Sequence, residues 1–337
     1  MTTSNNKYVV LGAGSWGTAL AMLLAKNNLD TTLWSHRDAQ ATQLQTDRAN
    51  INHIGDIKFP DALKISADLQ ASVKHASHIL IVVPSHSFRN LCQALKPLLS
   101  PTQKIVWASK GLETESCKLL HQIAKEEFPV TTPLAVLSGP TFAKEVAKGL
   151  PGAVTVASTK KEYALELAND FHCKTFRVYT SKDMIGVELG GAIKNVMAIA
   201  AGIADGLGFG SNSRAALIAR GVAEMMRLGL KLGAQHDTFM GLTGLGDLVL
   251  TSSDNQSRNR RFGLALGKGT SQQQALDDIQ QVVEGRYTAK AVYQLAQQHQ
   301  IDMPITEQVY KVLFEDLDAK TAAKSLMERA IRAEIDS

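Results

Sequence analysis

The chain has 337 residues, of which 45% are hydrophobic and 20% are charged, and its formal net charge is +4. This length predicts two domains of ordinary globular composition, and the charge is too small to require nucleic acid or an acidic membrane surface as a partner. Three cysteines without a CxxC pair favour free thiols in a reducing compartment, so we expect a cytoplasmic protein. We see no signal-peptide pattern, and polar residues interrupt the longest apolar run, so no stable membrane insertion is expected.

Short β-branched runs alternate with helical patterns through the first half of the chain. Runs such as Ile79–Val83 lack polar alternation, as expected for strands that helices cover on both faces. The pattern predicts an α/β fold that begins with a doubly wound, mostly parallel Rossmann sheet. The expected strands are Lys7–Leu11, Thr31–Ser35, Lys64–Ser66, His78–Val83, Lys104–Ser109, Leu134–Ser138, Ala153–Ala157 and Lys174–Tyr179.

The first strand leads directly into a glycine-rich turn, GAGSWG, and then into a helical segment. Gly12 permits the tight turn, Gly14 lets the backbone approach a pyrophosphate, and Gly17 allows the helix to pack closely on the strand. Ser15 and Trp16 open the helix, whose N-terminal amides attract an anion. This motif, in this position, predicts dinucleotide binding.

The end of the second strand is where such folds distinguish NAD from NADP. An acidic residue is expected there for NAD, but this chain has His36 and Arg37 at that point and Asp38 only afterwards. The basic pair suits a 2′-phosphate, so we expect NADP as the preferred cofactor. NAD stays possible, because Asp38 could bind a ribose and Arg37 could be solvated.

Later strands also end in polar residues, at the sheet edge where doubly wound proteins bind ligands. Lys110 follows the fifth strand, with an exposed turn lysine as the alternative. Gly139 and Thr141 follow the sixth, with helix capping by Thr141 as the alternative. Phe88, after the fourth strand, could lie beside a nicotinamide or in the core.

After Tyr179 the strand signals stop, and we place a domain boundary there, with a dinucleotide domain over residues 1–182 and an all-helical substrate domain over 183–337. The second domain is expected to start with a helix buried on all sides, Asp183–Gly206, in which Gly190 and Gly191 give clearance for another backbone or a substrate. The further expected helices are Ala215–Leu232, Arg260–Lys268, Thr288–His299 and Pro304–Glu315.

Lys194 stands in the middle of this apolar helix. A buried ammonium must find polar partners or lose its proton. One interpretation is structural, with carbonyls or a carboxylate such as Glu188 satisfying the charge. The other is a general acid/base, which Asn195 and Asp247 could orient.

The segment Gly241–Gly263 is rich in glycine and small hydroxyl residues and is expected to form a loop around a ligand; it contains Asp247. Ser257 is a plausible helix N-cap, which places Arg258 and Asn259 in a first turn suited to a phosphate. A solvated basic face is the alternative for this cluster. His75 and His78 lack further ligands, so no metal site is expected.

Read together, these stretches resemble the bacterial NAD(P)-dependent glycerol-3-phosphate dehydrogenase family over nearly the whole chain. The motifs are GAGSWGTALA (12–21), SKGLE (109–113), LSGPTFAKEV (137–146), ELGGAIKNVMAIAAGIADG (188–206), TGLGDLVLTSSDNQSRNRRFG (243–263) and VVEG (282–285).

The resemblance implies a helical domain of the 6-phosphogluconate dehydrogenase-like type and reversible hydride transfer between NAD(P)H and dihydroxyacetone phosphate. The product, sn-glycerol 3-phosphate, would feed phospholipid synthesis. Lys194 would be the proton donor and acceptor, and a homodimer is expected. The residues implied for substrate are Lys110, Gly139, Thr141, Lys194, Asp247, Ser257, Arg258 and Asn259. Those implied for the dinucleotide are Ser15, Trp16, His36, Arg37, Lys110, Ala143, Arg258, Val282 and Glu284, beside the loop glycines.

Two alternatives stay open at this point. A related β-hydroxyacid dehydrogenase also combines a Rossmann domain with a lysine on a long helix, but it needs a carboxylate site rather than the SRNRR cluster. A dinucleotide sensor without turnover is the other, although it would have little use for a lysine in an apolar helix.

Overall fold

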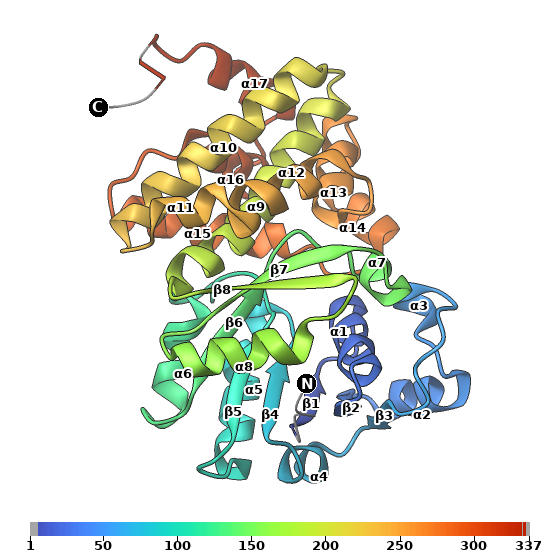
Figure 1. The fold of residues 1–337 in the computed structure, drawn as a ribbon. Helices are drawn as coiled ribbons and strands as arrows, with labels where there is room; N and C mark the ends of the chain where they lie inside the picture. Colours follow the sequence, from blue (N-terminus) through green and yellow to red (C-terminus); the bar gives the residue numbers. More distant parts are fainter. Residues whose placement is uncertain (1–5, 332, 335–337) are drawn as a thin grey trace.

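The computed structural model describes residues 6–331 and 333–334. Its N-terminal half is built on an eight-stranded sheet, and helices of the C-terminal half form a bundle at one end of that sheet (Figure 1). The strand order is β3-β2-β1-β4-β5-β6-β7-β8, and neighbours are parallel except β6 and β7. All eight expected strands are confirmed. They are β1 (Lys7–Leu11), β2 (Asp30–Trp34), β3 (Lys64–Ser66), β4 (His78–Ile81), β5 (Lys104–Trp107), β6 (Leu134–Ser138), β7 (Gly152–Ala157) and β8 (Phe176–Ser181).

The sheet is buried on both faces, which explains its unbroken apolar runs. Successive residues of a strand enter opposite cores: Leu80 packs on one side, and its neighbours Ile79 and Ile81 pack on the other. Helices α1 and α8 cover the first face, and α5 and α6 cover the second. The helices of this half are α1 (Ser15–Lys26), α2 (Asp38–Asp47), α3 (Ile51–Ile54), α4 (Leu69–Lys74), α5 (Phe88–Leu95), α6 (Leu120–Glu127), α7 (Ala143–Lys148) and α8 (Lys161–Phe171), with 3₁₀ turns η1 (Ser85–Ser87) and η2 (Lys96–Leu98).

Phe88 belongs to the apolar core on one face of the sheet. Its side chain is fully buried, and its ring lies 5.8 Å from that of Trp107 in an edge-to-face arrangement. Of the two positions considered for Phe88, the core position is the one observed.

Helix α9 (Met184–Gly206) is the centre of the C-terminal half, as expected. It begins where the Asp183 carboxylate accepts hydrogen bonds from the Gly186 amide and the Gln235 amide, both at 2.8 Å. Although α9 is long and apolar enough to cross a membrane, 94% of its most apolar stretch is buried inside the protein, so it is a core helix. The other helices are α10 (Ser211–Lys231), α11 (His236–Met240), α12 (Asp247–Ser253), α13 (Arg258–Gly267), α14 (Gln272–Ile279), α15 (Glu284–Gln298), α16 (Pro304–Phe314) and α17 (Ala319–Met327). The division into domains at residue 182 stays a prediction.

Glycines let two other segments approach the α9 backbone. A Cβ on Gly190 would lie 2.5 Å from the Thr243 carbonyl oxygen, so the clearance expected there serves another backbone. A Cβ on Gly202 would lie 2.2 Å from the Arg260 carbonyl oxygen, and one on Gly263 of α13 would lie 2.1 Å from that of Ile199. Helices α9 and α13 therefore pack backbone to backbone.

The prediction that Gly241–Gly263 forms a loop is wrong. A π-helical turn over Leu242–Gly246 runs directly into α12, and α13 starts five residues after α12 ends. The glycines serve packing here: a Cβ on Gly244 would lie 2.1 Å from the Phe239 carbonyl oxygen. A compact helical segment thus brings Asp247 against α9.

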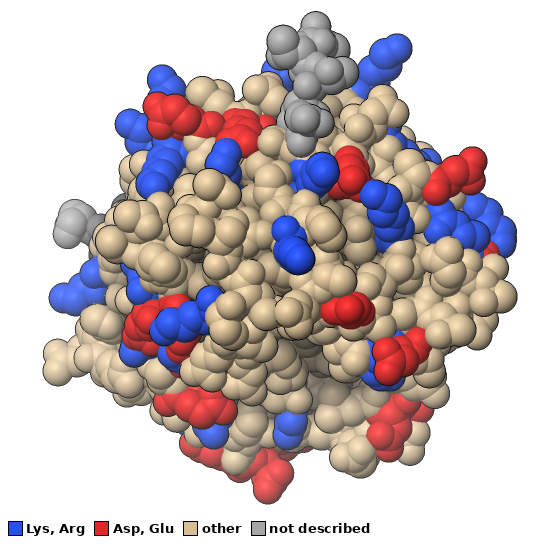
Figure 2. Space-filling view, turned by 90° about the horizontal axis from the view of Figure 1, so that it is seen from below, with Lys and Arg blue, Asp and Glu red and all other residues tan. Residues whose placement is uncertain are grey.

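The surface shows no concentration of one charge on the face seen from below in Figure 2. Lysine and arginine groups are interspersed there with aspartate and glutamate, and uncharged residues cover most of the area. This distribution agrees with the small net charge of the chain.

Candidate active site

The phosphate-binding turn between β1 and α1 has the geometry that its glycines predict. Gly12 has a φ of +122°, and a Cβ on it would lie 2.4 Å from the Val82 carbonyl oxygen. A Cβ on Gly17 would lie 1.9 Å from the Gly12 carbonyl oxygen. Among the described residues, in contrast, no atom lies within 4 Å of the Cβ position of Gly14, and no side-chain hydrogen bond caps α1. The turn therefore leaves open space and free helix amides for an anion, which fits a dinucleotide pyrophosphate.

Basic residues from three segments surround this turn. The Ser15 hydroxyl donates to the His53 carbonyl oxygen at 3.2 Å. Burial lowers the pKa of the His53 imidazole, and the nearby Arg258 and Arg37 guanidinium groups lower it further. Two arginines far apart in the sequence thus converge near α1, as a ligand with several phosphates requires. His53 was not expected from the sequence, because it lies in the short helix α3 outside any motif.

The end of β2 keeps the residues that were expected to select the cofactor at the surface. His36, Arg37 and Asp38 are all exposed. Ser35 is buried, and its hydroxyl donates to Gln40 at 2.7 Å, so it is turned toward α2. His36 and Arg37 are accessible to a 2′-phosphate, and Asp38 already belongs to the first turn of α2.

The centre of the site is a carboxylate held between two ammonium groups. Asp247, at the start of α12, is fully buried. One of its oxygens lies 2.7 Å from Lys194 Nζ on α9, and the other lies 2.6 Å from Lys110 Nζ after β5. Thr251 Oγ1 accepts a further hydrogen bond from Lys194 at 2.8 Å. Three segments of the fold therefore meet at one charged cluster.

Glu188 is not the partner of Lys194, so that part of the structural interpretation is wrong. The carboxylate is Asp247, 53 positions further along the chain. The sequence does not indicate Thr251, because residues four positions apart share a face only in a helix and this segment is expected to be a loop. Asn195 does not contact Lys194 in the hydrogen bonds observed, and its side chain binds Asn259 instead.

Electrostatics make Lys194 suitable for proton transfer near neutral pH. Burial lowers the pKa of Lys194 to about 8, the Lys110 ammonium adds to this effect, and the Asp247 carboxylate opposes it. Burial alone would raise the pKa of Asp247, but Lys110 and Lys194 outweigh it and hold that pKa below its usual range. Asp247 is therefore charged while Lys194 titrates.

A second set of contacts connects α9 to α13 and α15. Asn259 Nδ2 donates to Asn195 Oδ1 at 2.9 Å, and Asn259 Oδ1 accepts from the Gly285 amide at 2.9 Å. Ser257 is the N-cap of α13, as expected, and accepts from the Arg260 amide. These bonds fix the helix terminus that carries Arg258.

The Glu284 carboxylate lies at the start of α15, beside Ser85. Ser85 Oγ donates to it at 3.1 Å. Burial raises the pKa of Glu284 to about 7, whereas Ser85 and the Arg258 guanidinium counteract part of that rise. Arg258 thus influences both His53 and Glu284, which places it between the phosphate turn and α15.

Among the remaining expected residues, Gly139 and Thr141 lie beside Lys110. Lys110 Nζ donates to the Gly139 carbonyl oxygen at 3.2 Å, and Thr141 Oγ1 donates to the same oxygen at 3.4 Å. Thr141 does not cap α7, whose N-cap is Phe142. Ala143 starts α7, which packs on α1 and α3. Val282 is 39% exposed, and Trp16 Nε1 is buried with no hydrogen-bond partner among the described residues.

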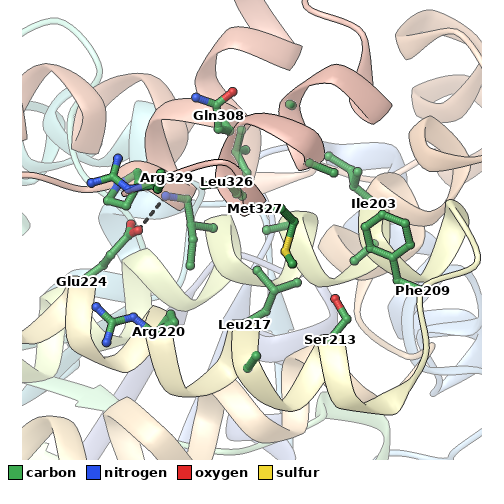
Figure 3. Close-up of a pocket in the computed structure, with 18 of the residues that line it drawn as sticks. Ile203, Phe209, Ser213, Leu217, Arg220, Glu224, Gln308, Leu326, Met327 and Arg329 are labelled. Carbon is green, nitrogen blue, oxygen red and sulfur yellow. Dashed lines mark hydrogen bonds between the residues drawn. The ribbon is translucent and has the colours of Figure 1, made fainter. Parts of the chain in front are cut away.

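A separate groove of about 430 Å³ lies between α9, α10, α16 and α17 (Figure 3). None of the expected site residues lines it. Within the described part of the chain, no group of three histidine, cysteine, aspartate or glutamate residues is arranged to hold a metal ion.

Comparisons with known proteins agree with this geometry. The family model for the NAD-dependent glycerol-3-phosphate dehydrogenase N-terminus matches residues 7–164, and the model for the C-terminus matches residues 183–324. Glycerol-3-phosphate dehydrogenase (NAD(P)+) from Colwellia psychrerythraea is 55% identical over 96% of this chain and 97% of its own length. The enzyme from Haemophilus influenzae is 52% identical over 99% of this chain and 100% of its own length.

Solved structures show the same similarity. The glycerol-3-phosphate dehydrogenase of Coxiella burnetii is 47% identical, with a TM-score of 0.94 over 96% of this chain and 99% of that chain. D-mandelate dehydrogenase, at 13% identity and a TM-score of 0.63, shares the fold alone. The expected combination of a Rossmann sheet with a helical domain of the 6-phosphogluconate dehydrogenase-like type is confirmed.

Proposed function

Because the chain belongs to the NAD-dependent glycerol-3-phosphate dehydrogenase family, we propose that the Lys110–Asp247–Lys194 cluster is its reaction centre. The protein is an oxidoreductase that interconverts dihydroxyacetone phosphate and sn-glycerol 3-phosphate with NAD(P)H, and its product feeds glycerophospholipid synthesis. The observation that carries the assignment is the buried Lys194 ammonium group, which lies 2.7 Å from the buried Asp247 carboxylate.

Lys194 is the general acid of ketone reduction. NADPH or NADH, when bound, supplies the hydride that becomes the new C–H bond. Lys194 Nζ gives its proton to the carbonyl oxygen as negative charge develops there, and Lys194 is left neutral. In the reverse direction, neutral Lys194 accepts the hydroxyl proton.

The ion pair with Asp247 holds the Lys194 ammonium group in one orientation. The negative charge of Asp247 also compensates part of the positive charge of Lys194. Lys110 binds the other oxygen of the Asp247 carboxylate. In this position Lys110 places a second ammonium group beside the developing alkoxide. Thr251, through its bond to Lys194, limits the rotation of the ammonium group. The mechanism therefore depends on three elements meeting within hydrogen-bond distance.

The terminus of α13 is the proposed holder of the substrate phosphate. Ser257 and Asn259 fix its backbone, and Arg258 provides a planar, doubly donating cation beside free helix amides. Binding of the substrate phosphate by this helix terminus would position the reacting carbon and disfavour substrates that lack the phosphate.

The dinucleotide is held by the turn over Gly12–Gly17, with His36 and Arg37 at the ribose end. NADP is the cofactor, and NAD is also possible. The exposed basic pair at the end of β2 supports the preference for NADP, because a 2′-phosphate gains charge-assisted hydrogen bonds there. We place the protein in the cytoplasm as a homodimer, with no nucleic-acid or membrane partner, on the family resemblance and the mild charge.

Initial rates of cofactor oxidation test the proposed function. Purified protein is given NADPH or NADH with dihydroxyacetone phosphate, and separately with a 2-keto acid of similar size. We expect turnover with dihydroxyacetone phosphate, faster with NADPH at low cofactor concentration. Turnover with the keto acid alone would favour a β-hydroxyacid dehydrogenase, and binding without turnover would favour a sensor. The comparisons support neither alternative.

A further inference from the structure

A second buried carboxylate on α9 points away from the reaction centre and into the Rossmann half. Glu188 is only 4% exposed. Its Oε1 accepts hydrogen bonds from Trp107 Nε1 at 3.0 Å and from the His121 amide at 2.9 Å. Its Oε2 lies 2.5 Å from His121 Nδ1. All of these partners belong to β5 and α6, so Glu188 joins the two halves of the molecule.

Glu188 stands among residues of two apolar clusters. Trp107, Leu120, Met184 and Val187 belong to one buried cluster, and Leu189 belongs to the next. Apolar contacts have little directional preference. If they alone joined α9 to the Rossmann half, the helix could rotate or slide slightly. Hydrogen bonds to a buried carboxylate are directional and costly to break, so they fix one register.

The bonded residues stand close in sequence to the reacting ones. Trp107 is the last residue of β5, and Lys110 follows three positions later. Glu188 and Lys194 share one continuous helix, six positions apart, which is an axial distance of about 9 Å. Between them, a Cβ on Gly191 would lie 2.7 Å from Ser138 Oγ and 3.6 Å from Lys110 Cγ, so α9 touches the Lys110 segment directly.

We propose that Glu188 is a positioning residue for the dehydrogenase reaction: through Trp107 and His121 it sets where α9 presents Lys194 against Lys110 and Asp247. The inference rests on the proposed function of Lys194. Both lysines bind one buried carboxylate, at 2.6 and 2.7 Å, so a small shift of α9 along β5 separates groups that must act together. Displacements of about 1 Å at a reaction centre lower turnover by roughly a hundredfold.

Three variants test the role of Glu188. Glu188→Leu removes every acceptor, Glu188→Gln keeps an acceptor for Trp107 and the His121 amide, and Trp107→Phe removes one bond from the opposite side. For Glu188→Leu we expect kcat to fall by about tenfold or more, with NADPH affinity within about twofold of wild type. The alkaline limb of kcat/KM for dihydroxyacetone phosphate should move to higher pH, because burial is the largest cause that lowers the pKa of Lys194 and a displaced Lys194 is more hydrated. Glu188→Gln should restore most of the activity, and Trp107→Phe should show a smaller effect in the same direction.

The matched control is Glu224→Gln. Glu224 is also a buried carboxylate of the helical half, but it accepts from the Ile305 and Thr306 amides at the start of α16, beside the groove of Figure 3. This control should keep the wild-type kcat and the wild-type alkaline limb of kcat/KM.

A folded Glu188→Leu protein with the kcat and pH profile of wild type would overturn the proposal. So would a shift of the alkaline limb of kcat/KM in Glu224→Gln that equals the shift in Glu188→Leu. If Glu188→Leu does not fold, Trp107→Phe decides in the same way. Failure of the proposed function is distinguishable, because a Lys194→Met variant would then keep its turnover whatever Glu188 does.

Discussion

At the scale of single residues, the proposed function depends on the protonation of Lys194. The ammonium group is buried beside Asp247, and burial together with Lys110 brings its pKa to about 8. Ketone reduction needs the protonated form, and alcohol oxidation needs the neutral form. The two directions should therefore respond to pH with opposite sign.

We predict that kcat/KM for dihydroxyacetone phosphate reduction falls as pH rises through about 8, while oxidation of sn-glycerol 3-phosphate rises to a plateau over the same range. Lys110→Met removes a cation that lowers the pKa of Lys194. In this variant the fall of kcat/KM for reduction should therefore occur at higher pH than in wild type. Initial rates in both directions, between pH 6.5 and 10, check this prediction. If kcat/KM for reduction fell at lower pH in Lys110→Met than in wild type, that result would contradict the electrostatic role of Lys110.

Arg37 gives a separate prediction about the cofactor. Arg37→Ala removes an exposed cation from the end of β2, so the KM for NADPH should rise by roughly tenfold or more, with the KM for NADH nearly unchanged. Steady-state rates with each cofactor measure the effect, and Asp38→Asn is the control. If Asp38→Asn instead weakens NADH alone, and Arg37→Ala changes neither constant, the site is built for NAD.

At the scale of secondary-structure elements, α9 holds the site together through close contacts with its neighbours. We predict that Gly202→Ala destabilises the protein by about 1–3 kcal/mol or more, because its Cβ would lie 2.2 Å from the Arg260 carbonyl oxygen. Helix propensity alone would favour the alanine by about 1 kcal/mol, so the sign of the change separates the two effects.

Urea unfolding measures this change, and Gly210→Ala is its control, since no atom of the described part of the chain lies within 4 Å of that Cβ position. A Gly202→Ala variant more stable than wild type would mean that α9 and α13 do not pack as described.

The start of α16 is held by Glu224, whose pKa burial raises to about 7. A carboxyl whose folded pKa exceeds its unfolded value contributes stability below about pH 4.5, and this contribution is lost as pH rises through 7. The free energy of unfolding of wild type, relative to Glu224→Gln, should therefore fall by roughly 2–3 kcal/mol between pH 5 and 8. Denaturant unfolding at both pH values measures it, and equal pH dependence of the two proteins would show that Glu224 does not titrate in this range.

At the scale of the whole molecule, the elements that depend on a local pattern of residues could be predicted from the sequence. The β-branched runs, the glycine turn and the buried helix each depend on neighbouring residues, and their positions were found within about two residues. Contacts between distant segments were not predictable in the same way. Nothing in the sequence around Lys194 distinguishes Asp247 from Glu188 as its partner, since only the folding of the π turn onto Gly190 decides it.

The errors have the same physical origin. Gly241–Gly263 was expected to be a loop because glycine and serine favour turns, yet here the glycines allow helices to pack backbone to backbone. His53 joins the cofactor site only through the placement of α3 against α1.

The most direct test of the whole arrangement compares wild type with Lys194→Met in NADPH oxidation by dihydroxyacetone phosphate, alongside NADPH binding by fluorescence titration. Methionine fills similar apolar space but cannot transfer a proton, so kcat should fall by at least about a hundredfold while the Kd for NADPH stays within about twofold. A folded Lys194→Met protein that turns over at a rate near wild type would contradict the assignment of Lys194 as the acid and base of this enzyme.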